Sequence, residues 1–225
     1  MKILVACERT QTVCKAFRLL GIEAFSCDLQ ECSGGRPEWH FKQDVFEVID
    51  MGIWDAMIAF PPCTHLAVSG AAWFEAKRKD GRQQEGIDFF MKIANAPIPV
   101  IAIENPVGIM SKLYRKPDQI IQPYYFGDEA QKTTCLWLKG LPPLYHNAAP
   151  NLFDTNVTHT GRGEFWQYFS KAKGKVQREP IWKKYTIGLK AEERSNERSK
   201  TFQGIANAMA IQWGGFLQTQ CNAKL

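Results

Sequence analysis

Short apolar runs alternate with helix-like stretches through the first half of the chain. Four runs have the length and apolar character of buried strands: residues 2–7, 23–27, 54–60 and 99–103. Between them, apolar residues recur at three- and four-residue spacing, which predicts helices over residues 12–20 and 83–94. Strands that alternate with helices predict an α/β fold, in which a mostly parallel sheet is flanked by helices.

The pattern is weaker in the rest of the chain. We expect a loop over residues 32–42, strands over residues 120–126 and 135–138, and a final helix over residues 202–213. Residues 145–199 are rich in charge, glycine and aromatic side chains and show little periodicity. We therefore expect one catalytic body, residues 1–144 and 199–225, that carries a small insert at residues 145–198.

The bulk composition is that of a globular enzyme. The chain has 225 residues, of which 45% are hydrophobic, and no stretch reaches the ~18 apolar residues of a membrane span. The first residues lack the pattern of a secretory signal, so we expect a cytoplasmic protein without a membrane partner. The seven cysteines are scattered and never spaced as Cys-x-x-Cys, and the four histidines form no ligand cluster. We therefore expect neither a disulfide framework nor a metal site.

Positive charge is concentrated in one segment of the chain. The net charge is +5, and residues 145–200 hold 11 Lys or Arg against 6 Asp or Glu, while the remainder has 17 of each. A neutral body with one basic insert is typical of an enzyme that binds a polyanion. A solvated, lysine-rich loop is the alternative interpretation of the same segment.

Two predicted strands end in a similar way, at a proline that lies next to a chemically useful side chain in the sequence. Residues 54–60 lead into Pro61-Pro62-Cys63, and residues 99–103 lead into Glu104-Asn105-Pro106. Because proline cannot continue a central strand, each motif is expected at the carboxyl edge of the sheet. Ligands of open α/β sheets bind at this edge.

These motifs resemble those of DNA cytosine-5 methyltransferases. Pro62-Cys63 is similar to the proline–cysteine motif of that family, and Glu104-Asn105 is similar to its glutamate–asparagine motif, in the same order. The resemblance is to the short, phage-type members in particular, and it spans most of residues 1–144 together with residues 199–214. It implies a Rossmann-like methyltransferase fold, DNA as the partner, S-adenosyl-L-methionine as the cofactor and, for a phage-encoded protein, the host cytoplasm as the location.

The family chemistry explains why a thiol and a carboxyl group are needed. A thiolate that adds to carbon 6 of cytosine makes carbon 5 nucleophilic enough to attack an electrophilic methyl group. By the resemblance Cys63 is that nucleophile, and Glu104 holds and protonates ring nitrogen 3. We also expect a helix after Thr64, whose amino end would favour the Cys63 thiolate.

The resemblance also implies where the cofactor and the substrate bind. A third catalytic residue would be Lys132, in a segment similar to the family's glutamine and double-arginine motif, although both arginines are replaced. The expected cofactor-binding residues are Ala6, Cys7, Glu8, Arg9, Thr10, Asp28, Leu29, Asp44, Val45, Pro61, Asn207 and Ala208. The expected substrate-binding residues are Pro62, Ser69, Asn105, Gln131, Lys171, Lys173 and Lys175. One departure from the family concerns the cofactor, because the first turn of this chain contains no glycine where the family has several.

Two other functions remain open at this point. The first is a related pyrimidine-modifying enzyme that acts on a nucleotide or a single strand, or that uses a different donor. The second is a catalytically idle nucleic-acid-binding relative, although such a module would need neither Cys63 nor Glu104. The sequence leaves the recognition site and the oligomeric state open.

Overall fold

The structure is a computed structural model that describes residues 1–147, 158–170 and 174–223. The chain divides into two compact units. The first comprises Met1–Ile121, Thr133–Tyr145 and Ala206–Leu225, and the second comprises Gln122–Lys132 and His146–Ile205. The segment Gln122–Lys132 thus belongs to the same unit as most of the basic segment.

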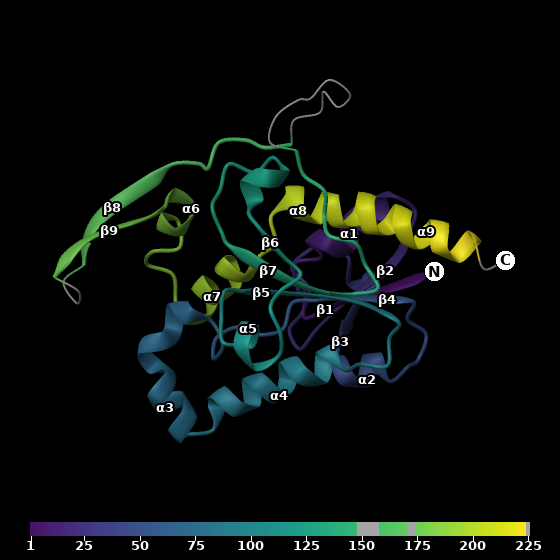
Figure 1. Ribbon diagram of the computed structural model, residues 1–225, viewed down its shortest axis with the longest axis horizontal. Coiled ribbons are helices and arrows are strands. Elements are labelled where there is room, and N and C mark those ends of the chain that lie inside the picture. The colour runs from purple at the N-terminus through teal and green to yellow at the C-terminus, as the bar shows by residue number, and fades with distance from the viewer. Residues whose placement is uncertain (148–157, 171–173, 224–225) are drawn as a thin grey trace. The chain divides into compact units, whose positions relative to one another are not determined.

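A seven-stranded sheet forms the centre of the first unit, in the order β3-β2-β1-β4-β5-β7-β6 (Figure 1). The strands are β1 (Lys2–Ala6), β2 (Glu23–Asp28), β3 (His40–Lys42), β4 (Ala56–Ala59), β5 (Val100–Pro106), β6 (Gln119–Ile121) and β7 (Thr134–Lys139). All neighbours pair in parallel except at β7, which is antiparallel to both β5 and β6. The predicted α/β fold with a mostly parallel sheet is confirmed.

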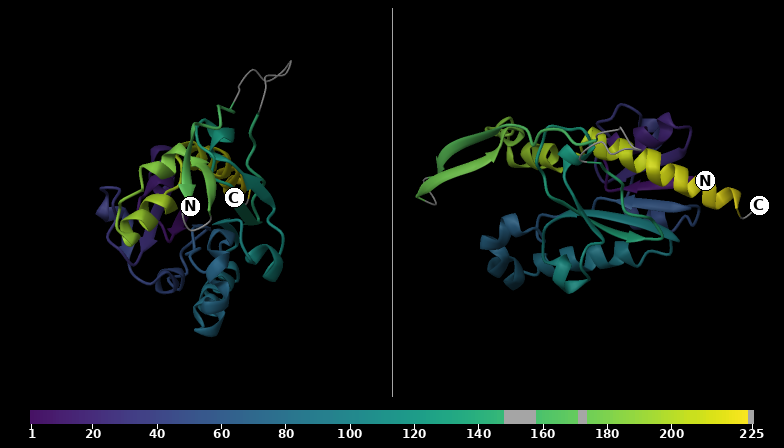
Figure 2. Two further views of the ribbon diagram at one scale, coloured as in Figure 1. Left: turned by 90° about the vertical axis from the view of Figure 1, so that its left-hand side faces the viewer. Right: turned by 45° about the horizontal axis from the view of Figure 1, so that its top comes forward.

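Helices cover both faces of this sheet (Figures 1 and 2). One face carries α1 (Thr12–Leu19), the π-helical turn η4 (Met209–Trp213) and α9 (Gly214–Asn222), and the other carries α2 (Val45–Ile49), α4 (Arg82–Ala94) and α5 (Met110–Leu113). On the second face the ring of Phe90 meets those of Tyr114 and Trp137 at 5.8 and 5.3 Å. Burial of aromatic and aliphatic side chains on both faces is the main source of stability for such a three-layer unit.

The strand order places a switch point between β1 and β4. From β1 the chain moves outward to β2 and β3, and it then returns to β4 on the other side of β1. The carboxyl ends of β1 and β4 therefore lead into loops that diverge at one edge of the sheet. Open α/β sheets bind ligands in the crevice at such a point.

Several predicted elements are corrected by the structure. Residues 32–42 are not only loop, because they contain the 3₁₀ turn η1 (Pro37–Trp39) and strand β3. The expected strand over residues 120–126 ends at Ile121, and Pro123 begins the 3₁₀ turn η3 (Pro123–Phe126), since proline cannot donate to a strand ladder. Strand β5 runs through Pro106, which lies opposite Thr134 as the last residue of the pairing.

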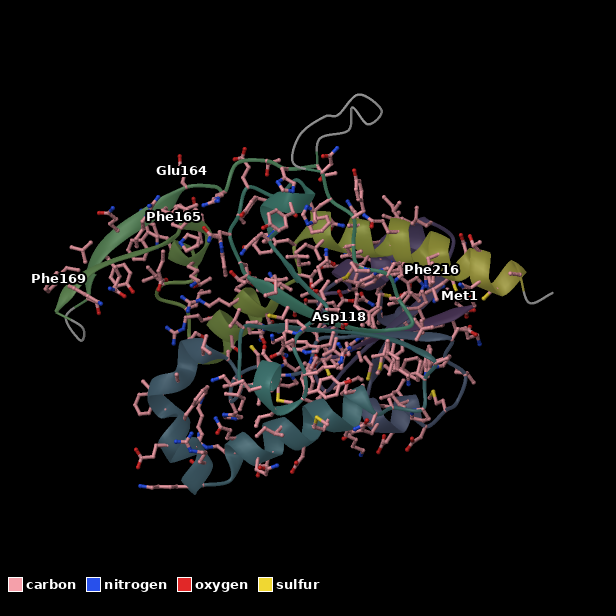
Figure 3. The ribbon with its side chains drawn as sticks, in the orientation of Figure 1. Met1, Asp118, Glu164, Phe165, Phe169 and Phe216 are labelled. Atoms are coloured by element: carbon pink, nitrogen blue, oxygen red, sulfur yellow. The ribbon has the colours of Figure 1, made fainter. Side chains whose placement is uncertain are left out.

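The second unit contains a β-hairpin that the sequence pattern did not reveal. Its strands are β8 (Phe165–Ser170) and β9 (Lys175–Pro180), followed by α6 (Ile181–Lys184), α7 (Ala191–Ser199) and the start of α8 (Gln203–Ala208). Figure 3 labels Phe165 and Phe169 on β8. Trp166 and Tyr168 stack at 4.6 Å on one face of the hairpin, while Phe169 and its partner Val176 are mostly exposed on the other. Aromatic residues on both faces hide the two-residue alternation of a strand.

Among the described residues, no helix has the length and apolar character required to cross a membrane.

Candidate active site at the carboxyl edge of the sheet

The loops that follow β4 and β5 are joined into one structure. Asn105 Nδ2 donates a buried hydrogen bond of 2.8 Å to the carbonyl of Pro61. Further along, Val68 N donates to Val107 O, and Ile109 N donates to Leu66 O, both at 3.0 Å. The proline–cysteine and glutamate–asparagine segments are therefore held side by side at the edge of the sheet.

Gly108 allows this close approach between the two loops. A Cβ atom at this position would lie 2.5 Å from the carbonyl oxygen of Leu66, nearer than real contacts allow. The missing side chain thus lets the backbone after β5 pass directly against the loop that carries Cys63.

Cys63 begins a single tight turn whose carbonyl groups are all occupied. The carbonyl of Cys63 accepts from Leu66 N and Ala67 N at 3.0 Å. Lys77 Nζ donates to Thr64 O at 2.6 Å, and Gln83 Nε2 donates to His65 O at 3.2 Å. The helix expected after Thr64 is wrong, because this turn leads into the 3₁₀ helix η2 (Val68–Trp73), and the first α-helix of the segment is α3 (Phe74–Lys79).

The side chains of the predicted active site differ in exposure. Pro62 and Ser69 are exposed, Cys63 and Glu104 are half-buried, and Asn105 is buried. In the sheet, Ala59 pairs with Ile103, so the residues after β4 and Glu104 on β5 continue at the same edge. Burial and the charge of Glu104 together raise the pKa of Cys135 to about 11, which places the Glu104 carboxylate beside β7 as well.

Four other cysteines are poor nucleophiles because of their surroundings. Burial, with the charges of Asp28 and Asp44, raises the pKa of the Cys7 thiol. Burial likewise raises the pKa of Cys14 and of Cys27 to about 12, and that of Cys135 to about 11. Thiols with such pKa values remain protonated at neutral pH, and the thiolate is the reactive form.

The turn after β1 makes its bend without glycine. Cys7 and Gln11 both adopt left-handed conformations, with φ of 58° and 59°. A non-glycine residue pays roughly 1–2 kcal/mol for this conformation. The turn therefore lacks glycine but still contains two residues with a left-handed backbone. Contacts around the turn must offset the energetic cost of this conformation.

The side chain of Glu8 supports this turn from inside. Its carboxylate is 4% exposed and accepts from Val13 N at 2.7 Å and from Cys14 N at 3.1 Å, so that it caps α1. Burial raises its pKa to about 7, although these backbone N–H groups act in the opposite direction. Because the carboxylate is occupied in this way, any contact of Glu8 with a cofactor would come from its backbone.

Gln11 ties the loop after β2 to the same turn. Its side chain is fully buried, accepts from Arg36 N at 3.1 Å and donates to Arg36 O at 2.7 Å. Ser33 N donates to Arg9 O at 2.9 Å, and a Cβ atom on Gly34 would lie 2.5 Å from Thr10 O. These contacts therefore hold the turn after β1 and the loop after β2 together at the edge of the sheet.

Two predicted cofactor residues, Asp28 and Asp44, lie close to Cys7. Asp28 Oδ1 accepts from Gln30 N at 2.9 Å, and Asp44 Oδ1 accepts from Phe46 N at 2.8 Å, where it caps α2. Both charges contribute to the raised pKa of Cys7, so both carboxylates approach the end of β1. In each carboxylate, the second oxygen has no hydrogen-bond partner among the described residues.

The other predicted cofactor residues differ in accessibility. Leu29 is 73% exposed at the end of β2, whereas Val45 is buried in α2 and Ala6 is buried in β1. Thr10 bonds through its hydroxyl to Thr12 at 3.0 Å. On α8, Asn207 is exposed and Ala208 is buried.

The second unit contains the predicted catalytic residue Lys132 and the predicted substrate residues Gln131 and Lys175. Lys132 Nζ donates to Lys200 O at 3.2 Å, and Gln131 O accepts from Trp182 Nε1 at 3.2 Å. Lys175 is exposed on β9. Lys171 and Lys173 lie outside the described residues. The catalytic role of Lys132 and the DNA contacts of the lysines stay predictions.

Comparison with known proteins gives a distant likeness of fold. No family model and no curated protein matches the chain. A solved structure that it resembles is that of a prophage-encoded E. coli protein provisionally described as a DNA modification methyltransferase, with a TM-score of 0.48 and 14% identity. The alignment covers 76% of this chain and 58% of that chain, so less than two thirds of the E. coli protein has a counterpart here. The function proposed below rests instead on the residues of this chain.

Sequence reasoning missed the donors that shape the Cys63 turn. Lys77 belongs to the run Lys77-Arg78-Lys79, which has the composition of a solvated helix end, and nothing in its spacing distinguishes it from its neighbours. Gln83 was expected at a helix start but without a role. In the described part of the chain, no group of three or more His, Cys, Asp or Glu side chains has metal-binding geometry.

Proposed function

We propose that the chain is a DNA (cytosine-5-)-methyltransferase that transfers a methyl group from S-adenosylmethionine to carbon 5 of cytosine through a covalent Cys63 adduct. The observation that carries this proposal is the buried hydrogen bond from Asn105 Nδ2 to Pro61 O, which joins the two motif segments on neighbouring strands. A thiol and a carboxyl group on segments fixed in this way can act on one small ring.

The chemistry assigns one step to each side chain. The Cys63 thiolate adds to carbon 6 of the cytosine, while Glu104 gives its proton to ring nitrogen 3 and so relieves the negative charge on the ring. Carbon 5 then becomes nucleophilic, and S-adenosylmethionine supplies the electrophilic methyl group when bound. Loss of the carbon 5 proton to water then expels the Cys63 thiolate, and ring nitrogen 3 returns its proton to Glu104, so that the ring is aromatic and neutral again.

The residues at the ends of β1 and β2 fit this cofactor. Among the described residues, Asp28 accepts a hydrogen bond through Oδ1 alone, so Oδ2 can accept one from a ribose hydroxyl. Arg9 Nε is buried and lacks a hydrogen-bond partner among the described residues, so it offers a donor for a carboxylate such as that of the methionine part. Asp44 and Val45 would contact the adenine.

The second unit would supply the contacts to DNA. On the hairpin, Phe169 and Val176 form a mostly exposed apolar pair. Arg178 lies on the same face of β9, and exposed Lys175 lies on the other face. Exposed aromatic side chains next to cations support binding to phosphates and stacking on bases. The target cytosine must also leave the duplex stack before a thiol can reach carbon 6.

DNA that contains 5-fluorocytosine tests this proposal directly. Fluorine at carbon 5 blocks the final elimination, so wild type with S-adenosylmethionine should give a denaturant-resistant adduct on Cys63. Cys63→Ser should give essentially none. A labelled methyl group from S-adenosylmethionine should appear in ordinary DNA only with wild type. Methylation that proceeds without an adduct would exclude this mechanism, and methylation of free nucleotides instead of DNA would favour the related pyrimidine-modifying enzyme.

A further inference from the structure

Lys77 is an unusual lysine in the Cys63 region because it is buried. Its side chain comes from α3, only 8% of the residue is exposed, and its ammonium group donates to Thr64 O at 2.6 Å. Lysine is almost never buried without a charged partner. Within the described residues, no carboxylate lies within ion-pair distance of Lys77, whereas Lys79 on the same helix pairs with Glu75 at 3.0 Å.

The site around this ammonium group is built to receive it. Gly70 lies beside the ammonium group, and a Cβ atom at this position would lie 3.3 Å from Lys77 Nζ. The charge of Lys77 also acts on His65, the next residue of the turn. The pKa of His65 is lowered first by burial and then by the charge of Lys77. Thr64, which accepts the hydrogen bond, is the direct neighbour of Cys63.

We propose that Lys77 is a positioning residue for Cys63, whose buried ammonium group holds the Thr64 carbonyl and favours the thiolate form of the neighbouring cysteine. This inference rests on the proposed function, in which Cys63 is the nucleophile. An unpaired buried cation costs stability in the resting protein. Ionisation of Cys63 would provide the missing opposite charge, so the same interaction that fixes the turn would also lower the energy of the reactive form.

Other charged groups also surround the turn and remain present in every variant described below. They are His65 in the turn, Asp80 before α4, Arg82 and Glu85 on α4, and Glu104 on β5. Arg82 and Asp80 form an ion pair with each other, and burial holds the pKa of His65 below its usual range. Lys77 is therefore the cation whose removal should change the field at Cys63.

The experiment measures how fast iodoacetamide alkylates Cys63 as a function of pH, in the full chain without DNA or cofactor. Mass spectrometry follows the Cys63 peptide, and exposed Cys221 serves as the internal reference thiol. Lys77→Gln keeps a hydrogen-bond donor but removes the charge, and Lys77→Met keeps the apolar length of the side chain. Both should raise the midpoint of the Cys63 profile and slow alkylation at pH 7 by about 3- to 30-fold, as expected for one charge close to a thiolate.

Three control variants separate charge from shape. Lys77→Arg keeps the charge and should keep a midpoint near that of wild type, while Lys79→Gln removes an exposed charge from the same helix and should change nothing. Gln83→Leu removes an uncharged donor to the same turn, at His65 O, and should also leave the midpoint in place.

Three results would overturn the proposal. They are an unchanged midpoint in both neutral Lys77 variants, an equal rise in Gln83→Leu, and failure of both neutral variants to fold, which would make Lys77 purely structural. None of these measurements requires methyl transfer. An unchanged midpoint therefore argues against the role of Lys77 alone, whereas a missing 5-fluorocytosine adduct argues against the proposed function.

Discussion

The turns after β1 and β4 lie at the same edge of one sheet, but different atoms hold them in place. In the turn after β1, the side chains of Glu8 and Gln11 point inward and form the hydrogen bonds themselves. In the turn after β4, donors from elsewhere, Asn105, Lys77 and Gln83, bind the backbone carbonyls. The first turn is held by its own side chains, whereas the backbone of the second turn is held by side chains from β5, α3 and α4.

This difference explains how the two turns can serve different purposes. A buried carboxylate that caps a helix is not available for catalysis, and a buried glutamine that locks a loop cannot hold a substrate. A turn whose backbone is fixed from outside can instead leave a half-buried thiol on its surface. Preorganisation of this kind is what a nucleophile needs, because its position is then set before the substrate arrives.

The sharpest test of the comparison removes the acid next to the second turn. In Glu104→Gln, ring nitrogen 3 can still be held but cannot be protonated, so methyl transfer and adduct formation should slow by roughly 10²- to 10⁴-fold. Single-turnover kinetics with saturating DNA would measure this. The exposed Glu47→Gln on α2 is the matched control and should keep the wild-type rate. A Glu104→Gln enzyme that is as fast as wild type would remove this carboxyl group from the mechanism.

In the first turn, a change at Glu8 should affect the stability of the fold and not the rate of methyl transfer. Burial raises the folded-state pKa of Glu8 from 4.5 to about 7, so the folded protein holds a proton there that the unfolded chain releases. The protonated Glu8 side chain contributes fully to stability below pH 4.5, and this contribution is lost as the pH rises to about 7. The free energy of unfolding should therefore fall across this window, by on the order of 3 kcal/mol for this group.

Denaturant titrations at pH 4.5, 5.5, 6.5 and 7.5 would measure the Glu8 contribution. Glu8→Gln keeps an acceptor for Val13 N but cannot titrate, so its stability should lack this part of the pH dependence. Exposed Glu38→Gln should retain the wild-type curve. If Glu8→Gln and wild type give parallel curves, the carboxyl group does not titrate in this range and the buried cap has an ordinary pKa.

These two turns also show how far the sequence could predict the molecule. Strands β1, β2, β4 and β5 and helices α1 and α4 follow directly from apolar periodicity. The prolines after β4 and at the end of β5 mark the edge where Cys63 and Glu104 lie. The hairpin β8–β9 was missed because aromatic side chains such as Trp166 and Phe169 occupy both of its faces. Strand β3 has only three residues, too few for any pattern.

The sequence could not predict which polar side chains serve structure. Glu8 is expected to contact a cofactor from its place after β1, but its carboxylate instead meets the first N–H groups of α1, and this depends on where the helix begins. Lys77 contacts Thr64 across thirteen residues that include a 3₁₀ helix. Periodicity says nothing about such a contact, since it depends on the path of the loop.

A smaller effect is expected at Asp28, which lies next to the first turn. Asp28→Ala should weaken binding of S-adenosylmethionine by about 1 to 3 kcal/mol, the usual cost of a lost hydrogen bond to a charged group. Isothermal titration calorimetry would measure this against Asp50→Ala, an exposed carboxylate at the end of α2. If wild type binds neither S-adenosylmethionine nor its demethylated product at millimolar concentration, the cofactor assignment is wrong for this edge.

The smallest effect is expected outside both turns, in the basic segment. If Lys171, Lys173 and Lys175 each meet a phosphate, changing all three to Gln should reduce the slope of log K against log salt concentration by up to about 3 units, because fewer counterions are released. Fluorescence anisotropy with labelled DNA over a range of salt would give the slope. Three exposed lysines of the first unit, Lys79, Lys112 and Lys116, provide a control variant with the same change in net charge. The adduct rate at saturating DNA should remain that of wild type in both variants, because neither alters Cys63 or Glu104. If wild type and both variants give equal slopes, the three lysines do not contact phosphates and the basic segment is a solvated loop. DNA would then have to bind another surface.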